Sequence, residues 1–189
     1  MHTKMTSQKD TLFASPLAKV DSFQFDNSVV DVFPDMIQRS VPGYSAIISA
    51  IGLLANRYAQ DNSNCYDLGC SLGAATLSMR HKITADDCKI IAVDNSTAML
   101  ERCQKIIERD TATLTVDLLC SDIQDVKINN ASVVVLNFTL QFIPLADRDA
   151  FIKKIYDGML PGGLLILSEK LMFTDERQQA LQTEMHHNF

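Results

Sequence analysis

Short apolar runs alternate with segments of helical periodicity along most of the chain after residue 44. The runs are rich in Val, Ile and Leu, which is typical of strands buried on both faces of a parallel sheet. Strands are therefore predicted at residues 65–69, 89–94, 114–120, 132–138 and 164–168. The segments between them predict helices at residues 74–80, from Asn95 or Ser96 onward, and at 147–159. This alternation predicts an α/β fold with a doubly wound, mostly parallel sheet.

The N-terminal part has a different pattern. Residues 1–45 are irregular and rich in proline and phenylalanine, whereas Ile47, Ile51 and Leu54 recur at helical spacing and predict an amphipathic helix over 44–60. We expect residues 1–60 to form a cap segment and helix packed on the core. Residues 61–189 are expected to form the α/β domain.

Length and composition narrow the functional classes. With 189 residues, 47% of them hydrophobic and 21% charged, the chain has the composition of one globular domain rather than a disordered one. The net charge of −6 argues against broad binding of nucleic acid, so none is expected. No apolar run approaches the roughly 20 residues of a membrane span, and the start lacks the apolar stretch of a signal peptide. We therefore expect no membrane association.

The cysteines and histidines predict neither disulfides nor a metal. There are 5 cysteines, an odd number, and no CxxC pair occurs. Free buried thiols in a reducing cytoplasm are the favoured interpretation over a metal site. His186 and His187 are adjacent, so their rings would diverge on a helix and would not chelate a metal ion.

Polar or glycine residues stand at the carboxyl ends of four successive predicted strands, which is where open parallel sheets bind ligands. The first strand ends in a turn with Gly69 and Gly73, and the second ends in Asp94. A carboxylate in that position can accept both hydroxyls of a ribose. Asp122 follows the third strand and Asn137 ends the fourth. We interpret the four ends together as a nucleoside site, although the GxxxG spacing is not a dinucleotide fingerprint and no P-loop occurs.

Two residues near this turn have structural interpretations. Cys70 has no histidine close in sequence that would activate it, so we expect a backbone contact to the ligand rather than a nucleophile. Asp67 is expected to orient the turn through hydrogen bonds to backbone amides.

These motifs resemble the class I, Rossmann-like S-adenosyl-L-methionine-dependent methyltransferases. The matching segments are YDLGCSLGAAT (66–76), IIAVDNSTAML (90–100), CSDIQD (120–125), VVVLNFTLQFI (133–143) and the PGG turn (161–163). The resemblance narrows to the carboxy-S-adenosyl-L-methionine synthases, a branch once assigned as tRNA methyltransferases. That narrowing rests on KDTLFASPLAKV (9–20), VFPDMIQRSVPGYSAIIS (32–49), LGCSLGAATLS (68–78), NFTLQF (137–142) and SEK (168–170).

The resemblance implies an adenosyl site in which each position has the expected residue type. Asp94 with Asn95 would bind the ribose, and Asp122 with Ile123 would bracket the adenine. Gly69, Cys70 and Ser71 would line the methionine part, with Asn137 on the same side. Tyr44 would cover the sulfonium end. No metal is implied.

The family's reaction uses S-adenosyl-L-methionine as a substrate. The resemblance implies carboxyl transfer from prephenate to its methyl carbon, which gives carboxy-S-adenosyl-L-methionine for 5-oxyacetyl modification of tRNA wobble uridine. The positive sulfur acidifies the methyl group and stabilises the ylide that captures carbon dioxide, so water must be excluded. No catalytic residue is assigned. A homodimer is implied.

The family's fold continues with further strands and helices, so we expect these, and the residues that bind the prephenate carboxylates, beyond Phe189. Arg39 and Lys170 are the local cationic candidates, each more typical of a structural or surface charge. Two alternatives to the synthase stay open. One is an ordinary methyltransferase acting on tRNA or a small molecule, and the other is a binding module without catalysis.

Overall fold

The computed structural model describes residues 33–188, which divide into two compact units. The larger unit comprises residues 46–170. The smaller unit combines the segment up to residue 45 with residues 171–189. The expectation that residues 1–60 cap the core concerns how these parts are placed together, and it stays a prediction. The motif at 9–20 lies outside the described residues.

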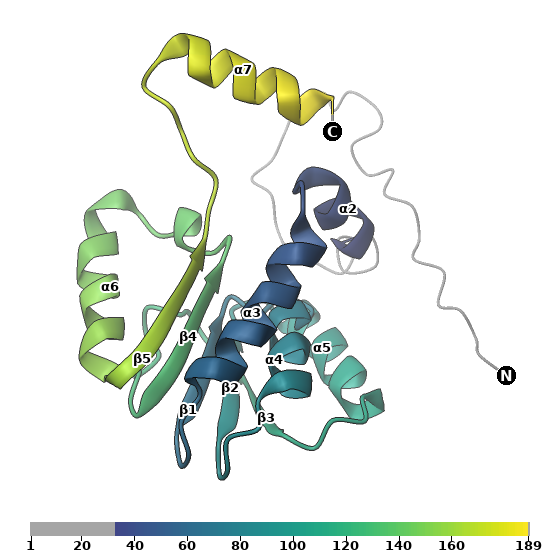
Figure 1. Cartoon of the computed structure of the whole chain (residues 1–189), viewed down its shortest axis with the longest axis vertical. Helices are drawn as coiled ribbons and strands as arrows, with labels where there is room; N and C mark the ends of the chain where they lie inside the picture. Colours follow the sequence, from purple (N-terminus) through teal and green to yellow (C-terminus); the bar gives the residue numbers. More distant parts are fainter. Residues whose placement is uncertain (1–32, 189) are drawn as a thin grey trace, which may run out of the picture. The chain divides into compact units, whose positions relative to one another are not determined.

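The larger unit is built on a parallel sheet in the order β3-β2-β1-β4-β5 (Figure 1). Its neighbouring strands pair in parallel throughout. The order reverses at β1, so the sheet is doubly wound as predicted. The strands are β1 (Asn64–Leu68), β2 (Lys89–Asp94), β3 (Thr115–Cys120), β4 (Ala131–Asn137) and β5 (Met159–Ser168).

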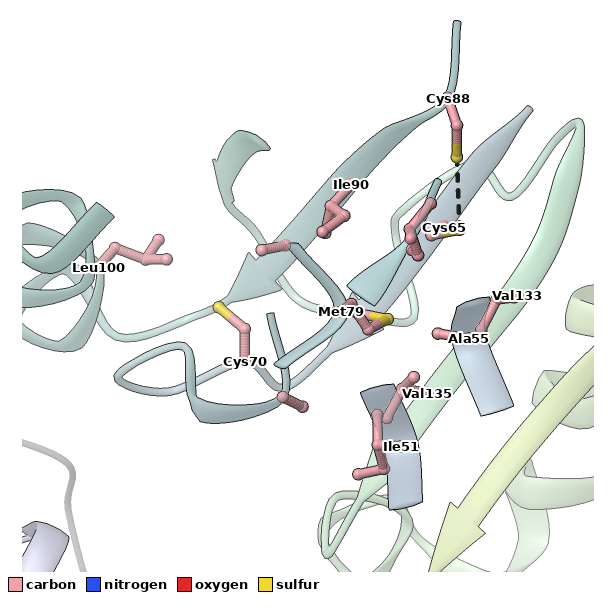
Figure 2. Packing of buried hydrophobic residues seen from close by; sticks show 13 residues of the cluster. Ile51, Ala55, Cys65, Cys70, Met79, Cys88, Ile90, Leu100, Val133 and Val135 are labelled. Atoms are coloured by element: carbon pink, nitrogen blue, oxygen red, sulfur yellow. Dashed lines mark hydrogen bonds between the residues drawn. The ribbon is translucent and has the colours of Figure 1, made fainter. Parts of the chain in front are cut away.

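Helices cover both faces of this sheet (Figure 1). On one face lie α3 (Tyr44–Tyr58), α4 (Ala74–Lys82) and α5 (Thr97–Arg109), and on the other lies α6 (Leu145–Gly158). Successive residues of β4 point to opposite faces, so Val133 and Val135 pack in the first layer, and Val134 and Leu136 in the second. Figure 2 shows the first layer, in which the β4 valines lie near side chains of α3. The α/β prediction is therefore confirmed.

One strand differs from its predicted bounds by more than one residue. The sequence predicts a turn at 161–163 followed by a strand, whereas β5 begins at Met159 and continues through these residues. Its register with β4 shifts between the pair Ala131–Met159 and the pair Val133–Leu164. Pro161, which cannot donate to a ladder, and Gly162, with φ 79°, are accommodated in this irregularity.

The smaller unit contributes helices α2 (Phe33–Ser40) and α7 (Glu176–His187). Helix α7 begins after Asp175, whose side chain accepts hydrogen bonds from the backbone N–H groups of Arg177 and Gln178. This is the usual chemistry of an N-cap. Within residues 33–188, no helix has the combination of length and apolar character that crossing a bilayer requires.

Candidate functional site

Asp94 joins two loops at the carboxyl end of the sheet. It is the last residue of β2, and its Oδ2 accepts a hydrogen bond from the Ser71 N–H in the turn after β1 at 2.8 Å. Its Oδ1 accepts from the Ser96 N–H at the start of α5 at 2.9 Å. The backbone N–H groups of Gly69 and Cys70 both donate to the Val93 oxygen, at 2.8 and 2.9 Å. The structure thus brings the predicted residues 69–71 together with Asp94.

The Asp94 carboxylate is ionisable but largely enclosed. Burial raises its pKa above the ordinary value, while the N–H groups of Ser96, Ser71 and Asn95 act in the opposite direction. A carboxylate has about four acceptor positions, so these backbone donors leave capacity for a further donor. The predicted ribose hydroxyls are donors of this kind. Asn95 lies between Asp94 and the helix cap Ser96, whose Oγ accepts from the Met99 N–H.

The predicted adenine residues lie in the next loop. Asp122 and Ile123 follow β3, and the Ser121 N–H just before them donates to the Asp94 backbone oxygen at 3.1 Å. Asp122 Oδ1 accepts from the Gln124 N–H at 2.8 Å, which fixes the carboxylate in an Asx turn. Asp122 with Ile123 is the pair that the resemblance assigns to the adenine.

Asn137 ends β4 beside the turn after β1. Its Oδ1 is buried and has no hydrogen-bond partner within residues 33–188. A buried acceptor without a donor is unusual in a folded protein, and a ligand group that donates would satisfy it. The α-ammonium of a methionine moiety is such a group, so the residues present fit the predicted ligand.

The space beside the Gly69 Cα atom is occupied by the side chain of Thr139. The φ of Gly69 is +83°, and a Cβ built on it would lie 2.5 Å from both Oγ1 and Cγ2 of Thr139. Glycine at this position therefore leaves room for the buried Thr139 side chain, and any larger side chain would first meet that residue.

The acid of β1 has a different partner from the one expected. Asp67 is 1% exposed, and its Oδ2 accepts from Thr76 Oγ1 in the first turn of α4 at 2.6 Å. Burial raises its pKa to about 6, the Thr76 hydrogen bonds oppose this, and the charge of Asp94 adds to it. Asp67 therefore anchors the start of α4 through the hydroxyl and the backbone N–H of Thr76, rather than through amides of the turn at 69–73.

Cys70 does not have the surroundings of a nucleophile. Its thiol is buried, and the hydrogen bond with Cys103 together with burial raises its pKa well above the ordinary value. The thiolate that nucleophilic chemistry requires is therefore disfavoured. Within residues 33–188, no group of three or more His, Cys, Asp or Glu side chains could hold a metal ion.

Three other residues were singled out from the sequence. Tyr44 is the first residue of α3 and belongs to the smaller unit, so its role over the ligand stays a prediction. Arg39 is also in that unit and forms an ion pair with Asp35 at 3.4 Å. Lys170 is exposed just after β5.

Two residues of this region received no role from the sequence. Thr139 and Glu169 stand in the quoted segments NFTLQF and SEK, but their importance lies in contacts across the chain. Thr139 faces Gly69, and Glu169 follows Ser168, which is the strand partner of Asn137. Spacing along the sequence contains no signal for such pairs.

Comparison with known proteins places this arrangement in a family. A family model described as a methyltransferase domain matches residues 66–163. The chain is 62% identical over 186 residues to the carboxy-S-adenosyl-L-methionine synthase of Trichlorobacter lovleyi, covering 98% of this chain and 76% of that protein. It is 61% identical to the synthase of Geobacter sp., with the same coverage of both chains.

A solved structure agrees at the level of the fold. The S-adenosylmethionine-bound amino pentose methyltransferase from Micromonospora echinaspora superposes with a TM-score of 0.56 at 17% identity, covering 83% of this chain and 63% of that one. This likeness shows the fold, and the sequence relatives show an enzyme of the S-adenosylmethionine-binding transferase class. The chain belongs to the carboxy-S-adenosyl-L-methionine synthase family, on a class I methyltransferase fold.

Proposed function

We propose that this protein transfers a carboxyl group from prephenate to the methyl carbon of S-adenosyl-L-methionine, giving carboxy-S-adenosyl-L-methionine. The observation that carries the proposal is the 62% identity to a protein named as this synthase, over 98% of the chain. The reaction balances when prephenate loses its ring carboxylate and ring hydroxyl to become phenylpyruvate. The methyl group loses a proton, which leaves with the hydroxyl as water.

The described residues supply a consistent set of contacts for the adenosyl substrate. Asp94, with Asn95 beside it, would accept the ribose hydroxyls, since its Oδ2 accepts from the Ser71 N–H and its Oδ1 from the Ser96 N–H, and a carboxylate has about four acceptor positions. Asp122 and Ile123 would hold the adenine. Ser71 is kept next to Asp94 by its own N–H, which supports a role for the turn along the same substrate.

The methionine end would lie between the turn after β1 and the end of β4. Gly69, Cys70 and Ser71 would contact it through backbone, and Asn137 Oδ1 would accept from its ammonium group. The buried and unpartnered state of that oxygen supports this assignment. Tyr44 would cover the sulfonium end and help to exclude water.

The proposal extends to the biological setting. The product would supply the 5-oxyacetyl group of modified wobble uridine in tRNA, and the protein would act as a cytoplasmic homodimer without binding RNA itself. The five cysteines are all free, which suits a reducing compartment. Light scattering after size exclusion would test the dimer.

An ordinary methyltransferase is the second candidate, favoured by the methyltransferase-domain match over residues 66–163. One experiment separates the two. The purified protein is incubated with S-adenosyl-L-methionine with and without prephenate, and products are followed by mass spectrometry. The synthase predicts prephenate-dependent phenylpyruvate and a product heavier than S-adenosyl-L-methionine by the mass of carbon dioxide. S-adenosyl-L-homocysteine with a methylated acceptor, and no such product, would contradict the proposal.

A further inference from the structure

Two buried cysteines lie side by side at the amino end of the sheet. Cys65 is the second residue of β1, and Cys88 immediately precedes β2. Their sulfur atoms are 3.6 Å apart, as the dashed line in Figure 2 marks. Two sulfur atoms at this distance touch each other, although 23 residues separate them along the chain. Folding therefore creates a thiol pair, Cys65 and Cys88, at the end of the strands opposite to Asp94 and the turn after β1.

Two hydroxyl groups border the thiol pair. Ser132 Oγ lies 3.7 Å from the Cys65 sulfur, and Ser63 Oγ lies 3.8 Å from the Cys88 sulfur. The two hydroxyls also share a hydrogen bond of 2.7 Å. No cluster of His, Cys, Asp or Glu large enough to hold a metal ion occurs within residues 33–188. The chemistry open to the pair is therefore that of two adjacent thiols.

The two thiols differ in exposure and in ionisation. Cys65 has no exposed surface, whereas Cys88 retains 6%. The hydrogen bond between them raises the pKa of Cys65, and burial acts in the same direction. The same hydrogen bond lowers the pKa of Cys88 to about 7, although burial opposes this. Because the thiolate is the reactive form, Cys88 is the better nucleophile of the pair and Cys65 is its protonated neighbour.

The backbone around Cys88 determines how readily a bond between the two sulfurs would reopen. Cys65 pairs with Ile90 of β2, two residues beyond Cys88, so the two cysteines are offset along the strands. A disulfide holds its sulfur atoms about 2 Å apart, so these sulfurs would have to approach by roughly 1.5 Å. Cys88 belongs to the connection 83–88 between α4 and β2, which is outside both elements. A bond that displaces this connection is strained, and strained disulfides are reduced more readily than relaxed ones.

We propose that Cys65 and Cys88 form a modification site that reacts with hydrogen peroxide and closes to a reversible disulfide. The Cys88 sulfur attacks one peroxide oxygen, the O–O bond breaks, and the departing hydroxide takes the Cys88 proton to become water. The Cys65 sulfur then attacks the resulting sulfenic sulfur, the S–O bond breaks, and the Cys65 proton leaves with the hydroxyl as a second water. The two thiols are thereby oxidised by two electrons, and one peroxide is reduced. Neither thiol is assigned to the adenosyl substrate, so the site does not depend on the proposed function.

The site is tested on the native protein and on Cys120→Ser, which lacks the exposed thiol. Each is treated with hydrogen peroxide, remaining thiols are alkylated with iodoacetamide, and tryptic peptides are analysed without reduction. Trypsin releases Cys65 in the peptide 58–80 and Cys88 in the peptide 83–89. We expect these peptides to be joined, with a mass two hydrogen atoms below their sum, and to separate again after dithiothreitol. Fragment ions locate the bonded cysteine in the longer peptide.

Two variants separate the roles of the thiols, and a third is the matched control. Dimedone, which labels sulfenic acids, is added together with the peroxide. Cys65→Ser removes the resolving thiol, so Cys88 should acquire the label, whereas Cys88→Ser should leave Cys65 unlabelled. Cys103→Ser removes a buried cysteine of α5 outside the pair, and its disulfide yield should equal that of the native protein.

The outcome on the native protein decides the proposal even if a variant fails to fold. Finding Cys65 and Cys88 both alkylated, after a treatment that oxidises Cys120, would overturn it. A Cys88 sulfinic acid beside a free Cys65 would also overturn it, because the two thiols would then not act as a pair. Label on Cys65 in Cys88→Ser, without label on Cys88 in Cys65→Ser, would overturn the assignment of the nucleophile.

Discussion

Asp94 is both a structural and a candidate ligand residue, and a variant must separate the two roles. Asp94→Asn keeps the shape but places an N–H₂ group opposite one of the two backbone donors and removes one acceptor. Each charge-assisted hydrogen bond to a ribose hydroxyl contributes roughly 1.5–3 kcal/mol. We therefore expect affinity for S-adenosyl-L-homocysteine to fall by about one to two orders of magnitude in calorimetry.

The control for this variant is Asp86→Asn, which changes an exposed carboxylate after α4 by the same chemistry. It should bind as the wild type does. Equal affinity in a folded Asp94→Asn would remove Asp94 from the site.

Asp67 makes stability depend on pH in the opposite sense to most carboxylates. Its pKa is raised to about 6 from 3.8, so the folded state binds its proton more tightly than the unfolded state. Its contribution is present below about pH 4 and is lost as the pH rises through 6. The loss amounts to about 3 kcal/mol by pH 8, because each pKa unit corresponds to roughly 1.4 kcal/mol.

Asp67→Asn should remove this dependence. Urea unfolding at intervals between pH 4 and 8 should show the wild type losing more stability with rising pH than the variant does. Parallel pH profiles for the two proteins would show that the Asp67 pKa is not raised in the folded state. Because Asp94 and Glu169 are present in both proteins, the difference between the profiles isolates Asp67.

At the level of elements, the turn after β1 and the segment after β4 are interlocked. Gly69→Ala would add a Cβ 2.5 Å from two atoms of Thr139, at a φ of +83°. Overpacking and left-handed strain together should destabilise the fold by about 2–4 kcal/mol in urea unfolding. The double variant Gly69→Ala/Thr139→Ala should recover the overpacking part and retain the strain. Strictly additive costs of the two changes would contradict direct contact between these elements.

The elements themselves were predictable where one periodicity dominates. The strand over 89–94 and the cap Ser96 agree with the sequence prediction, because a β-branched run followed by a capping hydroxyl has a single simple interpretation. The course of β5 through Pro161 was not predictable, because it depends on a register shift against β4 rather than on local propensity. The short 3₁₀ helix at Leu140–Phe142 is likewise bound by Arg148, which lies outside its own sequence and donates to the Gln141 and Ile143 oxygens.

The candidate site, too, is predictable only where its residues follow a local sequence pattern. The sequence identifies Asp94, Asp122 and Asn137 because each follows an apolar run and parallel strands share one carboxyl edge. It misses that Thr139 closes over Gly69 and that Thr76 is the partner of Asp67. Those contacts join residues through three-dimensional packing.

For the whole molecule, thiol accessibility gives a simple test of the packing. Four of the five cysteines are buried, and Cys120 is exposed at the end of β3. Although the hydrogen bond from Cys65 lowers the pKa of Cys88 to about 7, Cys88 is only 6% exposed. We expect one thiol to react rapidly with Ellman's reagent in the native protein and all five in urea. Cys120→Ser should abolish the rapid phase, and several rapid thiols in the native protein would contradict this packing.

The strand order also determines when the centre of the sheet can be completed during synthesis. Strand β1 pairs on one side with β2, where Asn64 meets Lys89, and on the other with β4, where Asn64 meets Ala131. The second partner leaves the ribosome 131 − 64 = 67 residues later. At about 5–20 residues per second this takes roughly 3–13 s. During that interval β1 has an open edge, and Tyr66 and Leu68 have not yet received their β4 neighbours. The nascent chain therefore passes through a stage in which chaperone binding is favoured, and which ends when β4 docks.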